Sequence, residues 1–360
     1  MGRGKGIVCW AFSQSCVALN ALSSGGVFLF PLYVPWLKQH YSPTQSELST
    51  IILAGMMGQY AFAVLWGAVI DSIGPHACSL AASALFLISW SAFAYLAANS
   101  LGSPAILAAL FFTAGVGRVA SYFSAIFASR SQKKSGLATS VPLALSGLSP
   151  LVLSYVAGLD VFQTPGGVFD VPKFVFWMGI GCTVIHAIGA IGLKHVDDLA
   201  NEEGERARLM GVSEDEHVIE AQREAMKAGC MVVQKVESDG AVSALLKDCG
   251  FWGYVAIGIV ITGTVSLQPC EWGCGSVSSI QHATCRPSIT SVIWGARNLG
   301  RNFGILSYAP LIGTPVFTYV YAWTSGQGRD WRTMFVISAS SAVAALVGCS
   351  MLWRRWSGRL

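Results

Sequence analysis

Charged side chains are scarce in this chain and unevenly placed. Only 12% of the 360 residues are Asp, Glu, Lys or Arg, whereas 53% are hydrophobic. Thirteen of the nineteen acidic residues lie between Lys194 and Asp248, so the remainder is nearly free of carboxylates. Helices of soluble proteins need a polar face, and most of this chain has too few charges to supply one. The composition therefore predicts a membrane protein whose polar residues gather in one central segment.

The sequence also lacks the residue patterns of an enzyme. No nucleophile with an adjacent base, phosphate-binding glycine loop or metal-ligand set stands out. Most of the ten cysteines lie singly, several of them in or beside apolar runs, where a thiol packs as a small hydrophobic group. Cys270, Cys274 and Cys285 do cluster near His282, but their irregular spacing does not resemble a structural zinc site. We therefore expect no catalytic activity, no cofactor and no bound metal.

Nine apolar runs have the length of roughly 20 residues that a membrane-spanning helix requires. Inside lipid, every backbone amide must be hydrogen-bonded within its own segment, so each run is predicted to form one helix. The fold class is therefore an all-α membrane protein. The predicted spans are residues 10–33, 51–70, 77–98, 105–127, 137–159, 174–193, 251–267, 303–323 and 334–353.

The distribution of basic residues sets the expected orientation. Short cytosolic loops carry an excess of Lys and Arg, and the facing loops here carry chiefly Lys38 and Lys173. The N-terminus and the central loop are therefore placed in the cytosol, and the net charge of +4 is a membrane-orientation bias with no nucleic-acid partner implied. The basic residues that define the cytosolic side are Arg3, Lys5, Arg130, Lys133 and Lys134.

Three regions follow from this layout: a six-helix bundle over residues 1–193, a cytosolic loop over 194–248, and an incomplete bundle over 249–360. The central loop is predicted to hold one surface helix, which a capping box of Ser213 and Glu216 begins and Gly229 ends. Six spans, a long cytosolic loop and further spans are typical of transporters built from two six-helix halves.

The segment from Gly67 to Gly74 resembles the signature loop between helices two and three of the major facilitator superfamily. Gly67 permits a close helix approach, Gly74 a tight reversal, and Asp71 can face the positive N-terminal end of another helix. The resemblance implies that this partner is helix eleven, near Arg301. The basic residues that usually follow the second glycine are replaced by Pro-His at 75–76.

Further stretches narrow the resemblance to nodulin-like transporters and the fungal monocarboxylate-transporter-homologue group. Residues 24–33 and 46–48 resemble the first hairpin of the nodulin-like proteins, and residues 136–138 with 147–149 resemble their fifth helix. Residues 300–306, 313–315 and 321–322 are similar to helix eleven of the fungal group. This resemblance implies a transporter of a small solute by alternating access, on the vacuolar membrane or, alternatively, the plasma membrane.

The resemblance fails over the polar residues 268–288, where helix eight should begin, so helices eight to ten are missing. A transcript or gene model that skips exons explains this, and so does a true truncated paralogue; a non-transporting remnant is the alternative function. Nine crossings from a cytosolic N-terminus would also leave Arg354, Arg355 and Arg359 outside, against the inside-positive rule.

Four residues are candidates for the solute site. Arg118 lies well inside the fourth span, where a guanidinium is costly unless it faces a water-filled cavity or a partner. It suits an organic anion bound bidentately, and a structural or gating pair is the alternative. His186, in the sixth span, is either a group that couples transport to a proton or a packed core histidine. Tyr122 and Tyr308 either line the cavity or pack between helices.

Overall fold

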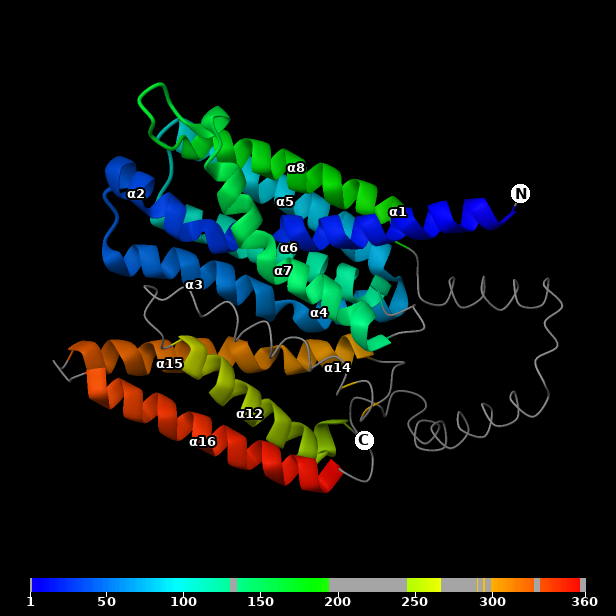
Figure 1. Cartoon of the computed structure of the whole chain (residues 1–360). Helices are drawn as coiled ribbons and strands as arrows, with labels where there is room; N and C mark the ends of the chain where they lie inside the picture. Colours follow the sequence, from blue (N-terminus) through cyan, green and yellow to red (C-terminus); the bar gives the residue numbers. More distant parts are fainter. Residues whose placement is uncertain are drawn as a thin grey trace. The chain divides into compact units, whose positions relative to one another are not determined.

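A computed structural model describes residues 2–129, 135–193, 245–266, 290, 294, 299–326 and 331–356. The described residues up to Leu193 form one compact unit and those from Leu245 onward form a second. Both units are helical, and the described part holds no strand beyond a single bridge between Gln163 and Phe169 (Figure 1). The predicted all-α fold is confirmed.

The first unit has helices at all six predicted spans, and two of the spans consist of broken helices. Among the described residues, five of the six are long and apolar enough to cross a membrane, whereas α7 has the shorter apolar stretch Val141–Ala157. The first span combines α1, η1 and α2, and its apolar part runs from Ala11 to Tyr41, beyond the predicted end at residue 33. The second combines α3 and α4. The elements are α1 Gly2–Ser23, η1 Ser24–Leu29, α2 Phe30–Tyr41, α3 Gln45–Ala61, α4 Ala63–Ser72, α5 Pro75–Ala98, α6 Pro104–Ser129, α7 Ser135–Ala157, η2 Asp160–Phe162 and α8 Val171–Gly192.

Local chemistry explains where these helices begin. The side chain of Thr44 accepts a hydrogen bond from the backbone N–H of Glu47, and the Glu47 carboxylate accepts one from the Thr44 N–H at 2.7 Å. This capping box satisfies two of the unpaired donors at the start of α3. Gly74 separates α4 from α5 with a φ of 111°, which favours glycine, and Pro75 then occupies the first turn of α5.

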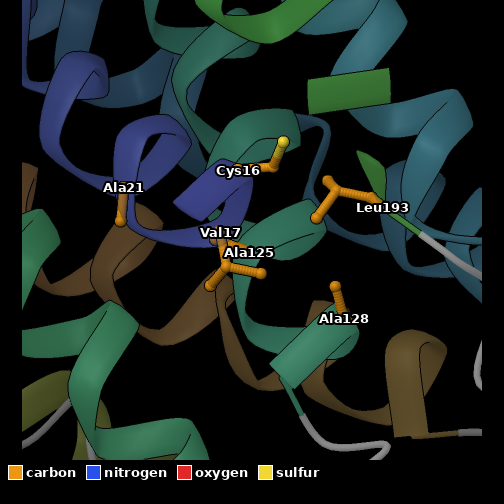
Figure 2. Packing of buried hydrophobic residues seen from close by; sticks show 6 residues of the cluster. All are labelled: Cys16, Val17, Ala21, Ala125, Ala128 and Leu193. Carbon is orange, nitrogen blue, oxygen red and sulfur yellow. The ribbon is translucent and has the colours of Figure 1, made fainter. Parts of the chain in front are cut away.

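Helix α6 is central to the first unit, where it packs against α1, α3 and α5, while α5 also packs against α8. Small side chains let these helices approach closely, as is usual for helix association within a membrane. Figure 2 shows one such contact, in which α1 meets α6 and the residue that follows α8. Its buried members are Cys16, Val17, Ala21, Ala125, Ala128 and Leu193.

The helix changes from α1 to the 3₁₀-helix η1 after Ser23, and the last four carbonyls of α1 lie at this junction. A nearby side chain supplies a donor to each of them, and three of the four donors come from other helices. Helix α7 has a second role here, because Ser149 Oγ also accepts a hydrogen bond from the Gly25 N–H at 2.7 Å. The carbonyls of Asn20, Ala21, Leu22 and Ser23 accept from Ser121, Ser24, Ser149 and Cys182, respectively.

The second unit contains α12 Cys249–Ser266, α14 Leu299–Leu306, α15 Tyr308–Gly326 and α16 Trp331–Trp356. These helices coincide with the three spans predicted after the central loop, except that α14 extends the second of them toward the N-terminus. The starts of α12 and α15 pack together through Phe251, Val255, Leu306 and Ala309.

Helices α12 and α16 run antiparallel within this unit. The Asp248 carboxylate, just before α12, lies 3.7 Å from the Arg355 guanidinium near the end of α16. The C-terminal end of α16 is therefore on the same side as the start of α12. Nine crossings would instead place these two ends on opposite sides of the membrane. The helix packing shows the same antiparallel arrangement. A Cβ at Gly250 would contact Trp356, one at Gly253 would contact Leu352, and one at Gly348 would contact Ile257.

Several sequence predictions lie outside the described residues. They include the surface helix between Ser213 and Gly229, the cysteine cluster near His282 and the whole polar segment 268–288. Within the described part, no group of three or more His, Cys, Asp or Glu residues is arranged to hold a metal ion. Five cysteines whose side chains the structure describes are free thiols: Cys16, Cys78, Cys182, Cys249 and Cys349.

Candidate functional site

Arg118 on α6 is held by two residues that precede it in the chain. Its Nη1 donates a hydrogen bond of 3.4 Å to Oε1 of Gln59, which α3 carries. Its guanidinium carbon lies 4.2 Å from the ring centre of Phe28 in η1, within the range of a cation–π contact. The broken first span and the second span thus both contribute to the surroundings of this charge.

Glycines bring α3 and α6 close enough for the Arg118–Gln59 contact. A Cβ at Gly115 would collide with the Gly55 carbonyl and lie 3.1 Å from the Gln59 nitrogen, and one at Gly58 would collide with the Phe112 carbonyl. Gly55 and Gln59 are one helical turn apart on α3, as Gly115 and Arg118 are on α6. The backbone contact at the glycines therefore places the two polar side chains beside each other one turn further along.

The charge of Arg118 is not neutralised within the part of the chain that the structure describes. Its hydrogen-bond partner is the uncharged Gln59 amide, its ring partner is Phe28, and no described carboxylate forms an ion pair with it. Two donors in this contact are also buried without an acceptor, Nε of Arg118 and Nε2 of Gln59. Buried donors normally have a partner, so these two atoms are exceptions within the described residues.

His186 lies in a different environment, fully buried between helices. Its Nδ1 is 2.7 Å from the Cys182 carbonyl on its own helix, and its Nε2 is 2.6 Å from Ser121 Oγ on α6. Ser121 in turn contacts the Asn20 carbonyl, at 3.2 Å, next to the break in the first span. The proton-coupling role of His186 stays a prediction, and its contacts connect it to the first span and not to Arg118.

The two tyrosine candidates lie in different units. Tyr122 follows Arg118 by one turn on α6, where it is half-buried and its ring is 6.1 Å from that of Phe123. Tyr308 begins α15 in the second unit and is also half-buried. Because the two units are described separately, the structure places Tyr122 with Arg118 and leaves the role of Tyr308 as a prediction.

The residues of the signature loop occupy the positions expected of a tight helix reversal. Gly67 is buried within α4 and Asp71 is half-buried one turn later. The N–H of Gly74 then donates to the Val69 carbonyl at 3.2 Å as the chain turns into α5. Arg301 is exposed on α14, in the second unit, so its pairing with this loop stays a prediction.

Sequence reasoning missed Gln59, Phe28 and Asn20. Gln59 had a usable signal, because it is the single amide side chain in an otherwise apolar span, and polar groups inside the membrane are expensive and often functional. Asn20 carries a similar signal in the first span. Phe28 carried none, because its place over Arg118 depends on the break in the first span.

Comparison with known proteins gives relatives of one kind. A probable transporter MCH1 from Candida albicans is 21% identical over 399 aligned residues, which cover 95% of this chain and 91% of that protein. A probable transporter mch1 from Neurospora crassa is 23% identical over 65% of this chain, but only 44% of that longer protein is covered. The Candida alignment is longer than the 360 residues of this chain, so that relative has residues without a counterpart here.

A solved structure shares the fold. The inward-open xylose transporter XylE from E. coli superposes with a TM-score of 0.54 at 13% identity, over 94% of this chain and 95% of that one. The profile of the Major Facilitator Superfamily matches residues 16–270, well over half of the sequence. With its helical units, its glycine reversal between α4 and α5 and this match, the chain belongs to the Major Facilitator Superfamily.

Proposed function

We propose that this protein carries a small organic anion across a membrane by alternating access, with Arg118 as the anion-binding residue. One observation supports the proposal above the others: a guanidinium inside a predicted span has no carboxylate partner in the described residues. A buried charge without a counter-ion is unfavourable, and a substrate anion supplies the missing charge in the loaded state.

The alternative role of Arg118, a structural or gating pair, has less support. Such a pair needs a carboxylate or several carbonyl acceptors, whereas the hydrogen bond found is a single one to the Gln59 amide. The Phe28 ring compensates only part of the lost hydration, because cation–π contacts contribute about 1–2 kcal/mol.

Substitution of Arg118 tests the proposal in the full protein that the locus encodes. Arg118→Ala is expected to lower anion uptake at least about 100-fold, because two hydrogen bonds to a charged group contribute about 3 kcal/mol or more. Arg118→Lys keeps the charge but loses the planar fork, so an intermediate activity is expected. The measurements are uptake into cells and the amount of protein in the membrane.

Lys173→Ala is the matched control, because Lys173 is an exposed cation at the start of α8. Normal uptake by the Arg118→Ala variant contradicts the anion-binding role. Failure of that variant to accumulate supports the structural role instead.

The coupling ion and the membrane are part of the same proposal. A proton is proposed as the coupling ion, with His186 as its carrier, and the XylE relative is itself described as a proton symporter of xylose. The vacuolar membrane is proposed as the location, supported by the resemblance to the fungal group, with the plasma membrane as the alternative. Microscopy of a tagged protein, together with uptake by isolated vacuoles, distinguishes the two locations.

A non-transporting remnant is the competing function. It is favoured by the polar segment 268–288 and by the extra residues of the Candida relative. Uptake by cells that express only this 360-residue chain separates the two, because a remnant gives the same background as an empty vector.

A further inference from the structure

We infer that Ser149 on α7 is a positioning residue that fixes the start of η1 and thereby holds Phe28 over Arg118. The inference rests on the proposed function of Arg118 and deepens it, because it names a residue that acts on the binding site through another. Ser149 is fully buried, and its hydroxyl bridges two backbone groups of the first span.

The Ser149 hydroxyl binds both groups that one turn of a 3₁₀-helix would pair with each other. It donates to the Leu22 carbonyl and accepts from the Gly25 N–H at 2.7 Å, and these two residues are three apart in the chain. A side chain that inserts into the hydrogen bonds of a helix in this way is a known cause of a kink. The bridge lies where α1 ends at Ser23 and η1 begins at Ser24.

Ser149 differs from the other side chains that donate at this junction. Those of Ser24, Ser121 and Cys182 bind carbonyls of α1, whereas Ser149 binds one group in α1 and one in η1. Gly25 allows this contact, because a Cβ there would collide with Ser149 Oγ and lie 2.9 Å from the Pro150 nitrogen. Loss of the hydroxyl would therefore release η1 from both α1 and α7.

The position of Phe28 depends on the helix type of this segment. A 3₁₀-helix turns 120° per residue and rises 2.0 Å, against 100° and 1.5 Å for an α-helix. Over the four steps from Ser24 to Phe28, the two forms differ by about 80° in direction and about 2 Å in height. The guanidinium carbon of Arg118 lies 4.2 Å from the Phe28 ring centre, so a change of this size would break the contact.

Ser149→Ala removes the bridge and leaves the rest of the side chain in place. Ser149→Cys retains a weak donor and a weak acceptor, so it is expected to change the same properties in the same direction by less. It replaces Ser149→Ala if that variant fails to accumulate. Ser146→Ala is the matched control, because Ser146 is also buried on α7 but its hydroxyl has no hydrogen-bond partner.

The first measurement is hydrogen exchange of the backbone amides of residues 24–29 in the purified full protein, followed by mass spectrometry. Ser149→Ala is expected to speed this exchange about tenfold, because the Gly25 N–H loses its acceptor and the junction opens more easily. Ser146→Ala should leave the rate unchanged. This readout needs no substrate, so it tests the bridge separately from the proposed anion site.

The second measurement is the KM for uptake of acetate, pyruvate and benzoate by cells that express the full protein. Phe28→Leu removes the ring over Arg118 and is expected to raise the KM about three- to tenfold. Ser149→Ala should raise the KM similarly, and the double variant should be no worse than Phe28→Leu alone. A residue that only stabilises the fold would lower the amount of protein and the maximal rate without raising the KM.

The possible outcomes separate the two proposals. Exchange rates that are equal in the Ser149 and Ser146 variants overturn the inference. So does an unchanged KM in Ser149→Ala, or one that adds to the effect of Phe28→Leu, while Arg118→Ala abolishes uptake. Normal uptake by Arg118→Ala, or no uptake of any of the three acids, overturns the proposed function and with it the effect of Ser149 on the site.

Discussion

At the scale of single residues, one hydroxyl proton of Ser121 faces two acceptors. A neutral His186 that donates from Nδ1 to the Cys182 carbonyl must accept a hydrogen bond at Nε2. Ser121 then donates its single hydroxyl proton to His186, and the Asn20 carbonyl loses the hydrogen bond from Ser121. A protonated His186 donates from both nitrogens, and Ser121 is then able to donate to Asn20. The three contacts are satisfied together only in the protonated form, so protonation of His186 would change the hydrogen bonds between α8, α6 and the end of α1.

His186→Gln is therefore expected to flatten the pH dependence of uptake, because Gln cannot change its charge. The uptake rate of the wild type should vary with pH and that of the variant should not. The measurement is the initial uptake rate as a function of pH. His40→Gln is the control, since His40 is exposed on α2. A variant with the wild-type pH profile would show that His186 is only a packed link between α6 and α8.

Residue-level prediction from the sequence singled out positions where one property was decisive. Arg118 was proposed because a guanidinium in an apolar span is conspicuous, and its role stays a prediction. Gly74 was proposed because a reversal needs a residue that tolerates positive φ, and its φ of 111° agrees with this. Gln59 and Phe28 were not found, because their importance depends on which helix faces Arg118. That choice follows from the glycine contacts between α3 and α6, which are long-range and leave no local pattern.

At the scale of elements, the contact between α3 and α6 is set by backbone atoms and not by side chains. Gly115→Ala is expected to destabilise the protein by about 1–3 kcal/mol, because the new methyl group would overlap the Gly55 carbonyl and the backbone cannot rotate away. Uptake should fall as well, since separation of the helices moves Gln59 away from Arg118. Thermal unfolding in detergent and uptake are the measurements.

Gly181→Ala is the matched control for that change. Gly181 also lies within a helix, α8, but a Cβ there would meet nothing within 4 Å. The stability of the Gly181→Ala variant should equal or slightly exceed that of the wild type, because Ala has a higher helix propensity than Gly. Equal behaviour of the two variants would show that the contact of α3 with α6 tolerates expansion.

The sequence predicted the elements of the first unit well and their interruptions poorly. Apolar length alone predicted a helix at six positions where the structure has helices, but it ended the first of them at residue 33. The helix continues to Tyr41. The Tyr41 hydroxyl donates to the Leu96 carbonyl near the end of α5 and to the Leu101 carbonyl in the loop that follows α5. The break after Ser23 was also missed, since the donors that stabilise it come from α6, α7 and α8.

At the scale of the whole molecule, the second unit constrains the number of crossings. The Asp248–Arg355 contact and the antiparallel packing of α12 and α16 put the end of α16 beside the start of α12. The start of α15 lies there too. Helix α12 has 18 residues, about 27 Å, which is close to the thickness of the hydrocarbon core. Its end at Ser266 is therefore on the opposite side from the start of α14.

An odd number of crossings must then connect Ser266 to Leu299 if this unit forms in a membrane. The intervening sequence has a single short apolar patch, residues 289–294, well below the roughly 20 residues that one crossing requires. Three spans satisfy both the parity and the inside-positive rule, because they return the C-terminal arginines to the cytosol. The longer alignment with the Candida relative is in line with additional residues in the intact protein.

We therefore predict that the intact locus encodes three further spans between Leu267 and Ile289, and that the 360-residue chain alone inserts poorly and is inactive. The chain as written cannot place α15 and α16 beside α12 without an apolar return, so a reporter after Leu360 should show mixed orientation and little protein in the membrane. Complementary DNA from the locus, sequenced across codons 267–289, tests the first part. The same reporter on the longer product should lie wholly in the cytosol. Complementary DNA that matches the written sequence, with uptake well above the empty-vector background from that product, would refute the prediction.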